Sequence, residues 1–431
     1  MLNNNVKQIH NVNRILTLTN IIITNSCKAN AGNTSSESDN LITIPGFINC
    51  WSYSWQSLFR NIPEMQNAGD NWMFNLAKRV DKMTLEDFYT AARTHYLECL
   101  LGGATTVVDC LYMVKDNAVF DQLVRAANDV GIRLILIRGS MDQNYWGNKF
   151  LSPFIQDRQK ILVESEAIIK KYHDTSDSAM VQVGLGPCSI KTGSKELYQE
   201  TAKLARQHDG VQLFTLLGEE PDEKKVCGFP SLSQYMKILD WLGDDVIFVN
   251  TVNLELNDLK RIAQNESKIV DCPRSNARGT GISKLQEMIE LEIPIGIGTA
   301  GAAGNDRCSM QDELLWARYS QGLRGLDYLK PHDVIQIGTK GGASIINRSY
   351  LGEIKNGYLA DLILYDTKNT IHYAGAVTDP VGSLVGSGHL DVHTAIVNGE
   401  IVVQNGRHVR LDHTEIIRKQ NETALRIEKQ L

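Results

Sequence analysis

The sequence has no long apolar run, no closely spaced cysteine pair and no block of basic residues. Its longest apolar stretch near the start, residues 15–23, is interrupted by polar side chains. It is too short to cross a bilayer and does not have the layout of a signal peptide, so it is expected to form a strand. The eight cysteines include no C-x-x-C pair, which indicates reduced thiols and a cytoplasmic protein.

Charge of either sign is too dispersed to indicate a dedicated surface for nucleic acid or membrane. The net charge is -6 over 431 residues, and 22% of the residues are charged. A hydrophobic share of 42% is typical of a globular protein with a large core. We therefore expect neither a nucleic-acid partner nor a membrane partner.

Histidine is missing from two long segments. None occurs between His10 and His95, and none occurs between His208 and His332. Imidazole is the commonest metal ligand in proteins and a usual ligand of catalytic zinc. Neither segment can provide one.

Short apolar runs alternate with amphipathic stretches from residue 45 onward. The runs expected to be strands are residues 105–110, 134–138, 181–186, 211–217, 246–249, 269–271 and 295–297. Helical patterns precede them, for example at residues 85–101, 117–130 and 160–172. Repeated units of this kind predict a parallel sheet, and eight in succession predict an α/β fold with a closed (β/α)8 barrel. On the pattern alone, a doubly wound sheet is the alternative.

The pattern changes after residue 348 to strands separated by Asn-Gly turns. Asn398-Gly399 lies between two apolar runs, which predicts a hairpin. Together with the N-terminal strand, these segments predict a small β-sandwich built from both termini, followed by a last helix at residues 413–429. The expected domains are residues 1–44 and 349–431 for the sandwich and residues 45–348 for the barrel.

Five motifs occur in the same order as in a known superfamily. They are Arg138-Gly-Ser-Met-Asp142, Gly186-Pro-Cys-Ser189, Trp241-Leu-Gly-Asp-Asp245, Cys272-Pro-Arg-Ser-Asn276 and Gly301-Ala-Ala-Gly-Asn-Asp306. In these motifs the chain resembles the amidohydrolase superfamily, and most closely its branch of 8-oxoguanine deaminases and hydroxyatrazine-type aminohydrolases. The resemblance implies a (β/α)8 barrel with a metal site at the carboxyl ends of its strands.

The superfamily holds its metal with two histidines, a histidine before a glutamate, a further histidine and an aspartate. The matching positions in this chain are Trp51 and Tyr53, Leu216, Asn250, and Ala300. Indole and isobutyl groups cannot ligate a metal, phenol and amide oxygens are weak donors, and alanine supplies no carboxylate. The resemblance therefore implies an intact scaffold with no metal and no cofactor. An unconventional metal site made of Cys50, Asp271 and Asp306 is the open alternative.

Three residues are the candidates for catalysis: Glu219, Tyr53 and Asp271. Glu219 matches the glutamate that shuttles protons in the superfamily, and partial burial would raise its pKa toward neutrality. The alternative is a solvated loop acid within the acidic run at residues 219–223. Tyr53 offers a hydroxyl group as an acid or hydrogen-bond donor. Asp271 either faces substrate or forms a salt bridge with Arg274.

Five residues are the candidates for substrate binding: Trp51, Gln56, Arg60, Asn250 and Asn276. Gln56 offers both a donor and an acceptor to an amide or guanidine edge, whereas Arg60 serves equally well to tie down a loop. The aromatic residues Trp51, Tyr53 and Trp55 either stack on a flat, nitrogen-rich substrate or fill the space that a metal would leave.

Two classes of function follow. The first is metal-free acid–base catalysis on a guanidino, ureido or pyrimidine-type small molecule in specialised metabolism, by ring closure or other C–N bond chemistry. The histidine-free signatures also resemble the amidohydrolase-like proteins of cylindrospermopsin biosynthesis, which implies formation of a uracil ring. The second is a catalytically inactive subunit that binds ligand or supports an active homologue. The resemblance further implies a homo-oligomer, with an active paralogue as another candidate partner.

Overall fold

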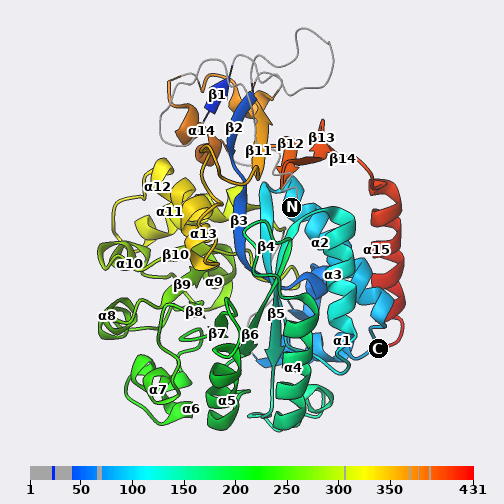
Figure 1. Ribbon diagram of the computed structural model, residues 1–431, viewed down its shortest axis with the longest axis vertical. Helices are drawn as coiled ribbons and strands as arrows, with labels where there is room; N and C mark the ends of the chain where they lie inside the picture. The colour runs from blue at the N-terminus through cyan, green and yellow to red at the C-terminus, as the bar shows by residue number, and fades with distance from the viewer. Residues whose placement is uncertain are drawn as a thin grey trace, which may run out of the picture.

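The computed structural model describes residues 22–24, 41–65, 70–304, 307–367, 370–376, 378–387 and 390–431. Most of the strand expected at residues 15–23 lies outside this set, and so does Asp306. The described chain forms a barrel with a small antiparallel sheet at one end of it (Figure 1).

Eight parallel strands form the barrel. They are β3 (Phe47–Ser52), β4 (Ala104–Leu111), β5 (Arg133–Ser140), β6 (Val181–Pro187), β7 (Leu213–Leu216), β8 (Val246–Val249), β9 (Lys268–Asp271) and β10 (Ile295–Ile297). Each strand pairs with the next one along the chain, and a bridge between Ser52 and Ala300 brings the last strand to the first. This arrangement confirms the (β/α)8 barrel and excludes the doubly wound sheet.

The strands are buried on both faces. Every residue of β4 and β5 is buried, which is why their sequences are continuous apolar runs rather than alternating ones. The expected strands coincide with the observed ones within a few residues, and β8 and β10 match residue for residue.

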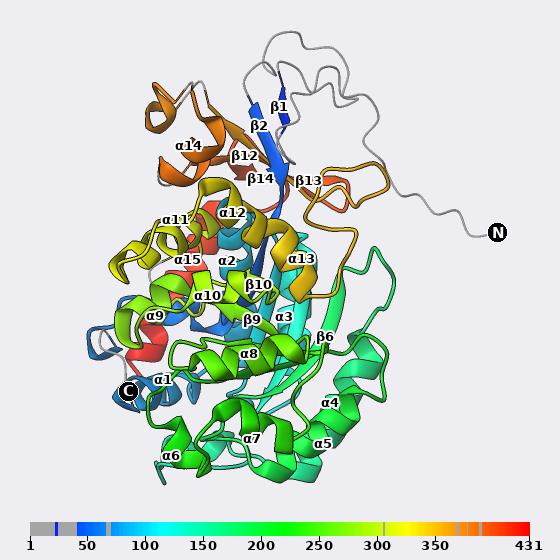
Figure 2. The same ribbon diagram turned by 90° about the vertical axis from the view of Figure 1, so that its left-hand side faces the viewer.

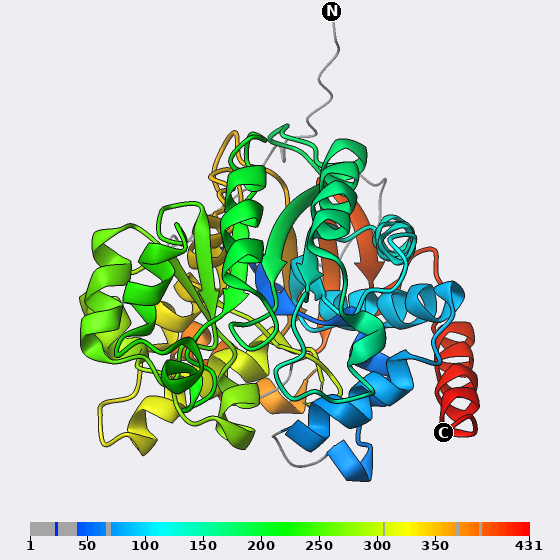
Figure 3. The same ribbon diagram turned by 90° about the horizontal axis from the view of Figure 1, so that it is seen from below.

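Helices surround the strands (Figures 2 and 3). They are α1 (Asp70–Val80), α2 (Leu85–Leu101), α3 (Val119–Val130), α4 (Arg158–Tyr172), α5 (Lys195–Ala205), α6 (Glu223–Cys227), α7 (Leu232–Ile238), α8 (Leu256–Gln264), α9 (Pro273–Gly279), α10 (Leu285–Glu290), α11 (Met310–Leu323), α12 (Pro331–Gln336) and α13 (Gly342–Ile345). Local sequence sets their ends. Helix α2 begins with a capping box between Thr84 and Asp87, and α3 ends at Gly131, whose φ of 72° suits glycine. None of the helices in the described ranges is long and apolar enough to span a membrane.

The small sheet combines strands from both ends of the chain. Its order is β1 (Ile22–Thr24), β2 (Leu41–Pro45), β11 (Leu362–Asp366), β12 (Val392–Val397), β13 (Glu400–Gln404) and β14 (Arg407–His408). The hairpin at Asn398-Gly399 is confirmed, and both residues have the positive φ of a tight turn. The described strands make one sheet, whereas the expected β-sandwich would need two.

Two features join the small sheet and the C-terminus to the barrel. Arg133 on β5 forms a buried ion pair of 3.0 Å with Asp361, the residue before β11. The last helix, α15 (His413–Glu428), lies against α2 on the outside of the barrel (Figure 1), and Arg93 on α2 pairs with Glu415 at 2.9 Å. A short helix, α14 (Pro380–Gly386), lies beside the small sheet.

Candidate active site

Five residues that the sequence singled out lie at the carboxyl ends of the barrel strands, the catalytic face of this fold. Trp51 and Tyr53 lie at and just after the end of β3, Leu216 ends β7, and Asn250 and Ala300 follow β8 and β10. Each of the five is 8% exposed or less. Asn250 and Ala300 have φ values of 58° and 53°, a left-handed conformation that costs energy in a residue other than glycine. Such strain is typical of functional sites.

Glu219 forms a hydrogen bond with Asn250. The Nδ2 atom of Asn250 donates to Oε1 of Glu219 over 2.8 Å. Burial raises the pKa of Glu219 to about 7, Asn250 and the nearby Lys191 act to lower it, and the charge of Glu220 acts to raise it. A carboxyl group that titrates near neutrality is suited to general acid–base chemistry, and it differs from a solvated loop acid.

The turn that carries Glu219 is held by side chains on both sides. The carboxylate of Glu223 accepts hydrogen bonds from the backbone N–H groups of Gly218 at 2.7 Å and Glu220 at 3.0 Å. Nδ2 of Asn253 donates to the carbonyl oxygen of Glu219 over 2.8 Å. Glu223 is only 3% exposed. This role could not be predicted from the sequence, because Glu223 closes an acidic run that is typical of a solvated loop.

An aromatic cluster occupies the centre of the barrel mouth. The rings of Trp51 and Phe214 stack with centroids 5.9 Å apart. Tyr53 meets Trp51, Trp55 and Tyr112 edge to face, with centroids 5.5, 6.1 and 5.6 Å away. Phe214 and Tyr112 were not singled out from the sequence, because nothing separates them from ordinary residues of buried apolar segments. The Trp51–Phe214 pair fills space inside the barrel.

Asp271 lies in a buried polar group at the end of β9. Its Oδ1 atom accepts hydrogen bonds from Nδ2 of Asn276 at 2.6 Å and from Oγ of Ser283 at 2.5 Å. Burial raises the pKa of Asp271 to about 6, and the two donors act to lower it. Arg274 pairs with Glu313 at 2.8 Å. Of the two alternatives for Asp271, the salt bridge with Arg274 is therefore not the arrangement observed, and Asn276 binds Asp271.

The side chains of Gln56 and Arg60 contact different parts of the structure. Gln56 is 1% exposed, and its side chain packs directly against Gly301. The contact is so close that a Cβ atom added to Gly301 would lie 1.7 Å from Oε1 of Gln56. Arg60 lies against α2, where its two terminal nitrogens donate to the two carboxylate oxygens of Glu98 over 3.2 and 2.6 Å. Arg60 therefore ties the segment after β3 to the outer helix, which was the structural alternative for this residue.

Three buried polar atoms of the mouth residues have no hydrogen-bond partner within the described part of the chain. They are the donors Nε1 of Trp51 and Nε2 of Gln56 and the acceptor Oδ1 of Asn250. Buried polar groups in native proteins are almost always paired, so unpaired ones call for an explanation. Two donors and one acceptor would satisfy a ligand that presents both an oxygen and an N–H group.

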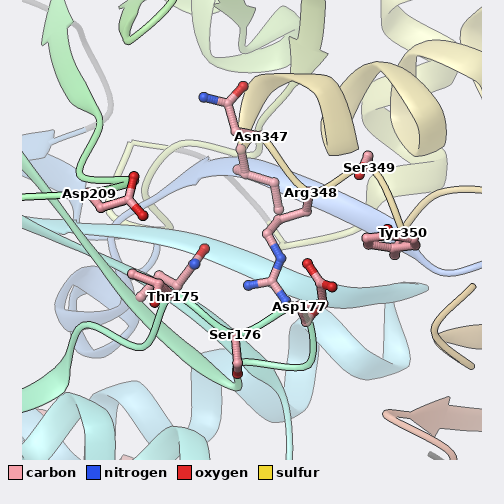
Figure 4. A pocket seen from close by; sticks show the side chains of 11 residues that line it. Thr175, Ser176, Asp177, Asp209, Asn347, Arg348, Ser349 and Tyr350 are labelled. Carbon is pink, nitrogen blue, oxygen red and sulfur yellow. Dashed lines mark hydrogen bonds between the residues drawn. The ribbon is translucent and has the colours of Figure 1, made fainter.

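Two cavities lie elsewhere. One, of about 130 Å³, is at the opposite end of the barrel, where Arg348 reaches toward Asp177 and donates to its carbonyl oxygen (Figure 4). Burial lowers the pKa of Arg348 to about 10. The other is a groove of about 870 Å³ between α2, α15 and the small sheet. Glu219 lines neither of them.

Residues 42–402 match the sequence profile of the amidohydrolase family. The chain belongs to the amidohydrolase family. It is 29% identical over 393 residues to the 8-oxoguanine deaminase of Pseudomonas aeruginosa, an alignment that covers 89% of this chain and 87% of the deaminase. It is 28% identical over 399 residues to a hydroxydechloroatrazine ethylaminohydrolase of a Pseudomonas species, covering 88% and 81% of the two chains.

Two solved structures share the fold of this chain. An atrazine chlorohydrolase from Arthrobacter aurescens, complexed with zinc, superimposes with a TM-score of 0.82 at 24% identity, covering 89% of this chain and 88% of the other. A triazine hydrolase from the same organism superimposes with a TM-score of 0.83 at 25% identity, with the same coverage.

Zinc does not fit the donor set at this mouth. Zinc is held by imidazole, thiolate and carboxylate groups. By the resemblance, the positions of the superfamily's ligands hold an indole, a phenol, an isobutyl group, an amide and a methyl group. Among the described residues, the one group of three or more His, Cys, Asp or Glu side chains close enough to share an ion is His95, Cys99 and Cys308, which lies elsewhere.

Proposed function

We propose that this protein binds a small, nitrogen-rich molecule at the barrel mouth and acts on it by acid–base chemistry of Glu219, without a metal at that site. The observation that carries this proposal is the hydrogen-bonded pair of Glu219 and Asn250. It sets a carboxyl group of pKa about 7 in a mouth whose side chains do not suit zinc. A base with a pKa near the working pH is the most effective proton carrier.

The substrate class follows from the relatives and from the unpaired atoms. The relatives include deaminases of 8-oxoguanine and isoxanthopterin and an ethylaminohydrolase of hydroxydechloroatrazine, and these substrates are rich in nitrogen. A ureido edge presents a carbonyl oxygen that would accept from Nε1 of Trp51 and Nε2 of Gln56. Its N–H group would donate to Oδ1 of Asn250. A guanidino or pyrimidine compound with a neighbouring carbonyl group would meet the same atoms.

The reaction that suits this site is ring closure within the substrate. A substrate nitrogen attacks a carbonyl carbon of the same molecule, so the new C–N bond needs no activated water. Glu219 takes the proton from the attacking nitrogen and delivers it to the leaving group as the old bond breaks. Holding the two reacting atoms together supplies much of the barrier lowering. Formation of a uracil ring, as in cylindrospermopsin biosynthesis, is the member of this class that the sequence resemblance favours.

Two other groups complete the proposed site. Burial raises the pKa of Tyr53 well above its usual value, and nearby Glu219 adds to this effect. The phenol therefore stays protonated and serves as a hydrogen-bond donor to the carbonyl oxygen. Asp271, held by Asn276 and Ser283, is proposed to orient the part of the ligand above β9.

The test is turnover of a panel of α,β-unsaturated ureido and guanidino acids by the purified chain. Such acids already carry the ring double bond, so closure with loss of water gives a pyrimidine, which is followed by its ultraviolet absorbance. We expect turnover that a chelator leaves unchanged and that Glu219→Gln lowers by about 10²–10⁴-fold. The matched control is Glu220→Gln, one position along the same turn. Turnover that survives Glu219→Gln would contradict the proposal, and so would turnover that a chelator abolishes while circular dichroism shows an intact fold.

A second candidate function is a ligand-binding or structural subunit. The stack of Trp51 on Phe214 favours it, because these rings fill space that a substrate would otherwise use. Under this proposal the isolated chain turns over no member of the panel yet alters the activity of a homologue with which it is mixed. Sedimentation of the chain alone and of the mixture separates self-association from pairing with a paralogue.

A further inference from the structure

A cluster of three metal-ligating side chains lies in the wall of the barrel. His95 and Cys99 are four residues apart on α2, which places them on one face of the helix. Cys308 lies two residues before α11. The ligand atoms of the three lie within 4.8 Å of one another, and Sγ of Cys308 is 3.3 Å from Nδ1 of His95. All three side chains are buried.

We propose that His95, Cys99 and Cys308 form a structural metal site for zinc, separate from the barrel mouth. One imidazole and two thiolates are a soft donor set of the kind that binds zinc in proteins. With Zn–S bonds of about 2.3 Å and Zn–N bonds of about 2.0 Å, tetrahedral ligand atoms lie roughly 3.5–3.8 Å apart. The three atoms already approach this spacing, so small side-chain rotations bring them to an ion.

Neighbouring residues orient the cluster. Nδ2 of Asn49 on β3 approaches Sγ of Cys99 at 3.6 Å as a donor, and it also donates to Oγ1 of Thr299 over 2.9 Å. The backbone N–H of Thr299 donates to Oδ1 of Asn49 over 3.0 Å, which fixes the orientation of the amide. An amide donor beside a sulfur stabilises its thiolate form, and partners of this kind hold metal ligands in place.

The charges around the cluster also suit a dication. Two thiolates would neutralise it, and the nearest carboxylate, that of Glu98, already pairs with Arg60 and accepts the backbone N–H of Cys308 at 3.1 Å.

The position of the cluster would give the ion access from the surface and a structural role. Cys308 lines the groove of about 870 Å³, which can admit the ion and a solvent molecule as its fourth ligand. An ion there would tie the C-terminal half of α2 to the start of α11.

The experiment is metal analysis of the full-length chain, purified without added metal and without a metal-affinity column. We expect about one zinc per chain, at least a tenfold loss of zinc in Cys99→Ser and Cys308→Ser, and no loss in the buried control Cys110→Ser. Circular dichroism shows whether each variant is folded. Cobalt added to metal-depleted wild-type protein should give a near-ultraviolet thiolate-to-cobalt absorption band, which does not depend on any variant.

Three results would overturn the proposal. They are wild-type protein with neither bound zinc nor the cobalt band, zinc content that is unchanged in folded Cys308→Ser, and a Cys99–Cys308 disulfide found by mass spectrometry under non-reducing conditions. None of these results bears on turnover by Glu219, so the failure of this inference and the failure of the proposed function are distinguishable.

Discussion

Asn250 donates a hydrogen bond of 2.8 Å to the carboxylate of Glu219. By resemblance, Asn250 stands where the superfamily has a metal-binding histidine, and Glu219 stands where it has the proton-shuttling glutamate. Burial favours the neutral form of Glu219, while the amide donor favours the charged form, and the balance is a pKa of about 7. Asn250 therefore holds the pKa of Glu219 below the value that burial alone would give.

The pH dependence of turnover follows from this pair. If Glu219 acts as a base, kcat/KM falls as the pH drops below about 7, the pKa of this group. Asn250→Leu removes the donor that lowers the pKa, so the midpoint of the acidic limb should move to higher pH. The measurement is kcat/KM against pH for both proteins. A midpoint near the ordinary value for glutamate, or one that does not move, would count against the assignment.

Glu219→Gln should change stability in a pH-dependent way. The folded-state pKa of about 7 lies above the unfolded value of about 4.3, so the folded protein binds the extra proton between these values. Stability from this group is present below pH 4.3 and is lost as the pH rises through 7. The glutamine variant should therefore melt above the wild type at pH 8 and close to it at pH 4.5. If the substitution changes Tm by the same amount at both pH values, Glu219 is a solvated acid.

Glu223→Ala should destabilise the turn that carries Glu219. The substitution leaves the backbone N–H groups of Gly218 and Glu220 without their acceptor, which costs about 1–3 kcal/mol. Asp222→Ala is the control, because its half-exposed carboxylate pairs with Lys191, which keeps Glu220 as a second partner, and its loss should cost less than about 1 kcal/mol. Urea unfolding of the two variants and the wild type gives the loss in free energy of unfolding for each substitution. Similar costs would show that Glu223 does not hold the turn.

Trp51→Ala should leave a cavity inside the barrel. A buried tryptophan that is 2% exposed and stacked on Phe214 contributes about 3–5 kcal/mol to folding. Trp316→Ala, at a position 41% exposed on α11, should cost far less and is the control. Addition of a flat nitrogen heterocycle to Trp51→Ala should raise its Tm if the ring takes the place of the indole. An unchanged Tm in Trp51→Ala would contradict both roles considered for Trp51, which are stacking on a substrate and filling space inside the barrel.

Much of the fold was accessible from the sequence. Strands buried on both faces leave continuous apolar runs, so β8 and β10 could be placed to the residue, and Asn398-Gly399 marked its hairpin. The small sheet was harder to define, because pairing between β2 and β11 joins residues more than 300 positions apart and leaves no local pattern.

The site was only partly accessible. The resemblance to the superfamily pointed to Glu219 and Asn250 as candidates, but not to the hydrogen bond between them. The charge pattern predicted a solvated loop around Glu223. It cannot distinguish a solvated glutamate from a buried one whose carboxylate accepts hydrogen bonds from backbone N–H groups. At Asp271 the sequence left two alternatives open, and the structure excludes the salt bridge, because Arg274 binds Glu313 instead. Whether a polar side chain pairs with a near or a distant neighbour depends on tertiary packing.

The central claim is that the barrel mouth works without a metal. The most direct test is anomalous diffraction at the zinc absorption edge from crystals of the wild-type protein grown with zinc present. Our account predicts no anomalous peak within bonding distance of Tyr53, Asn250 or Glu219, whatever is found at Cys99 and Cys308. A strong peak between those mouth residues would contradict it.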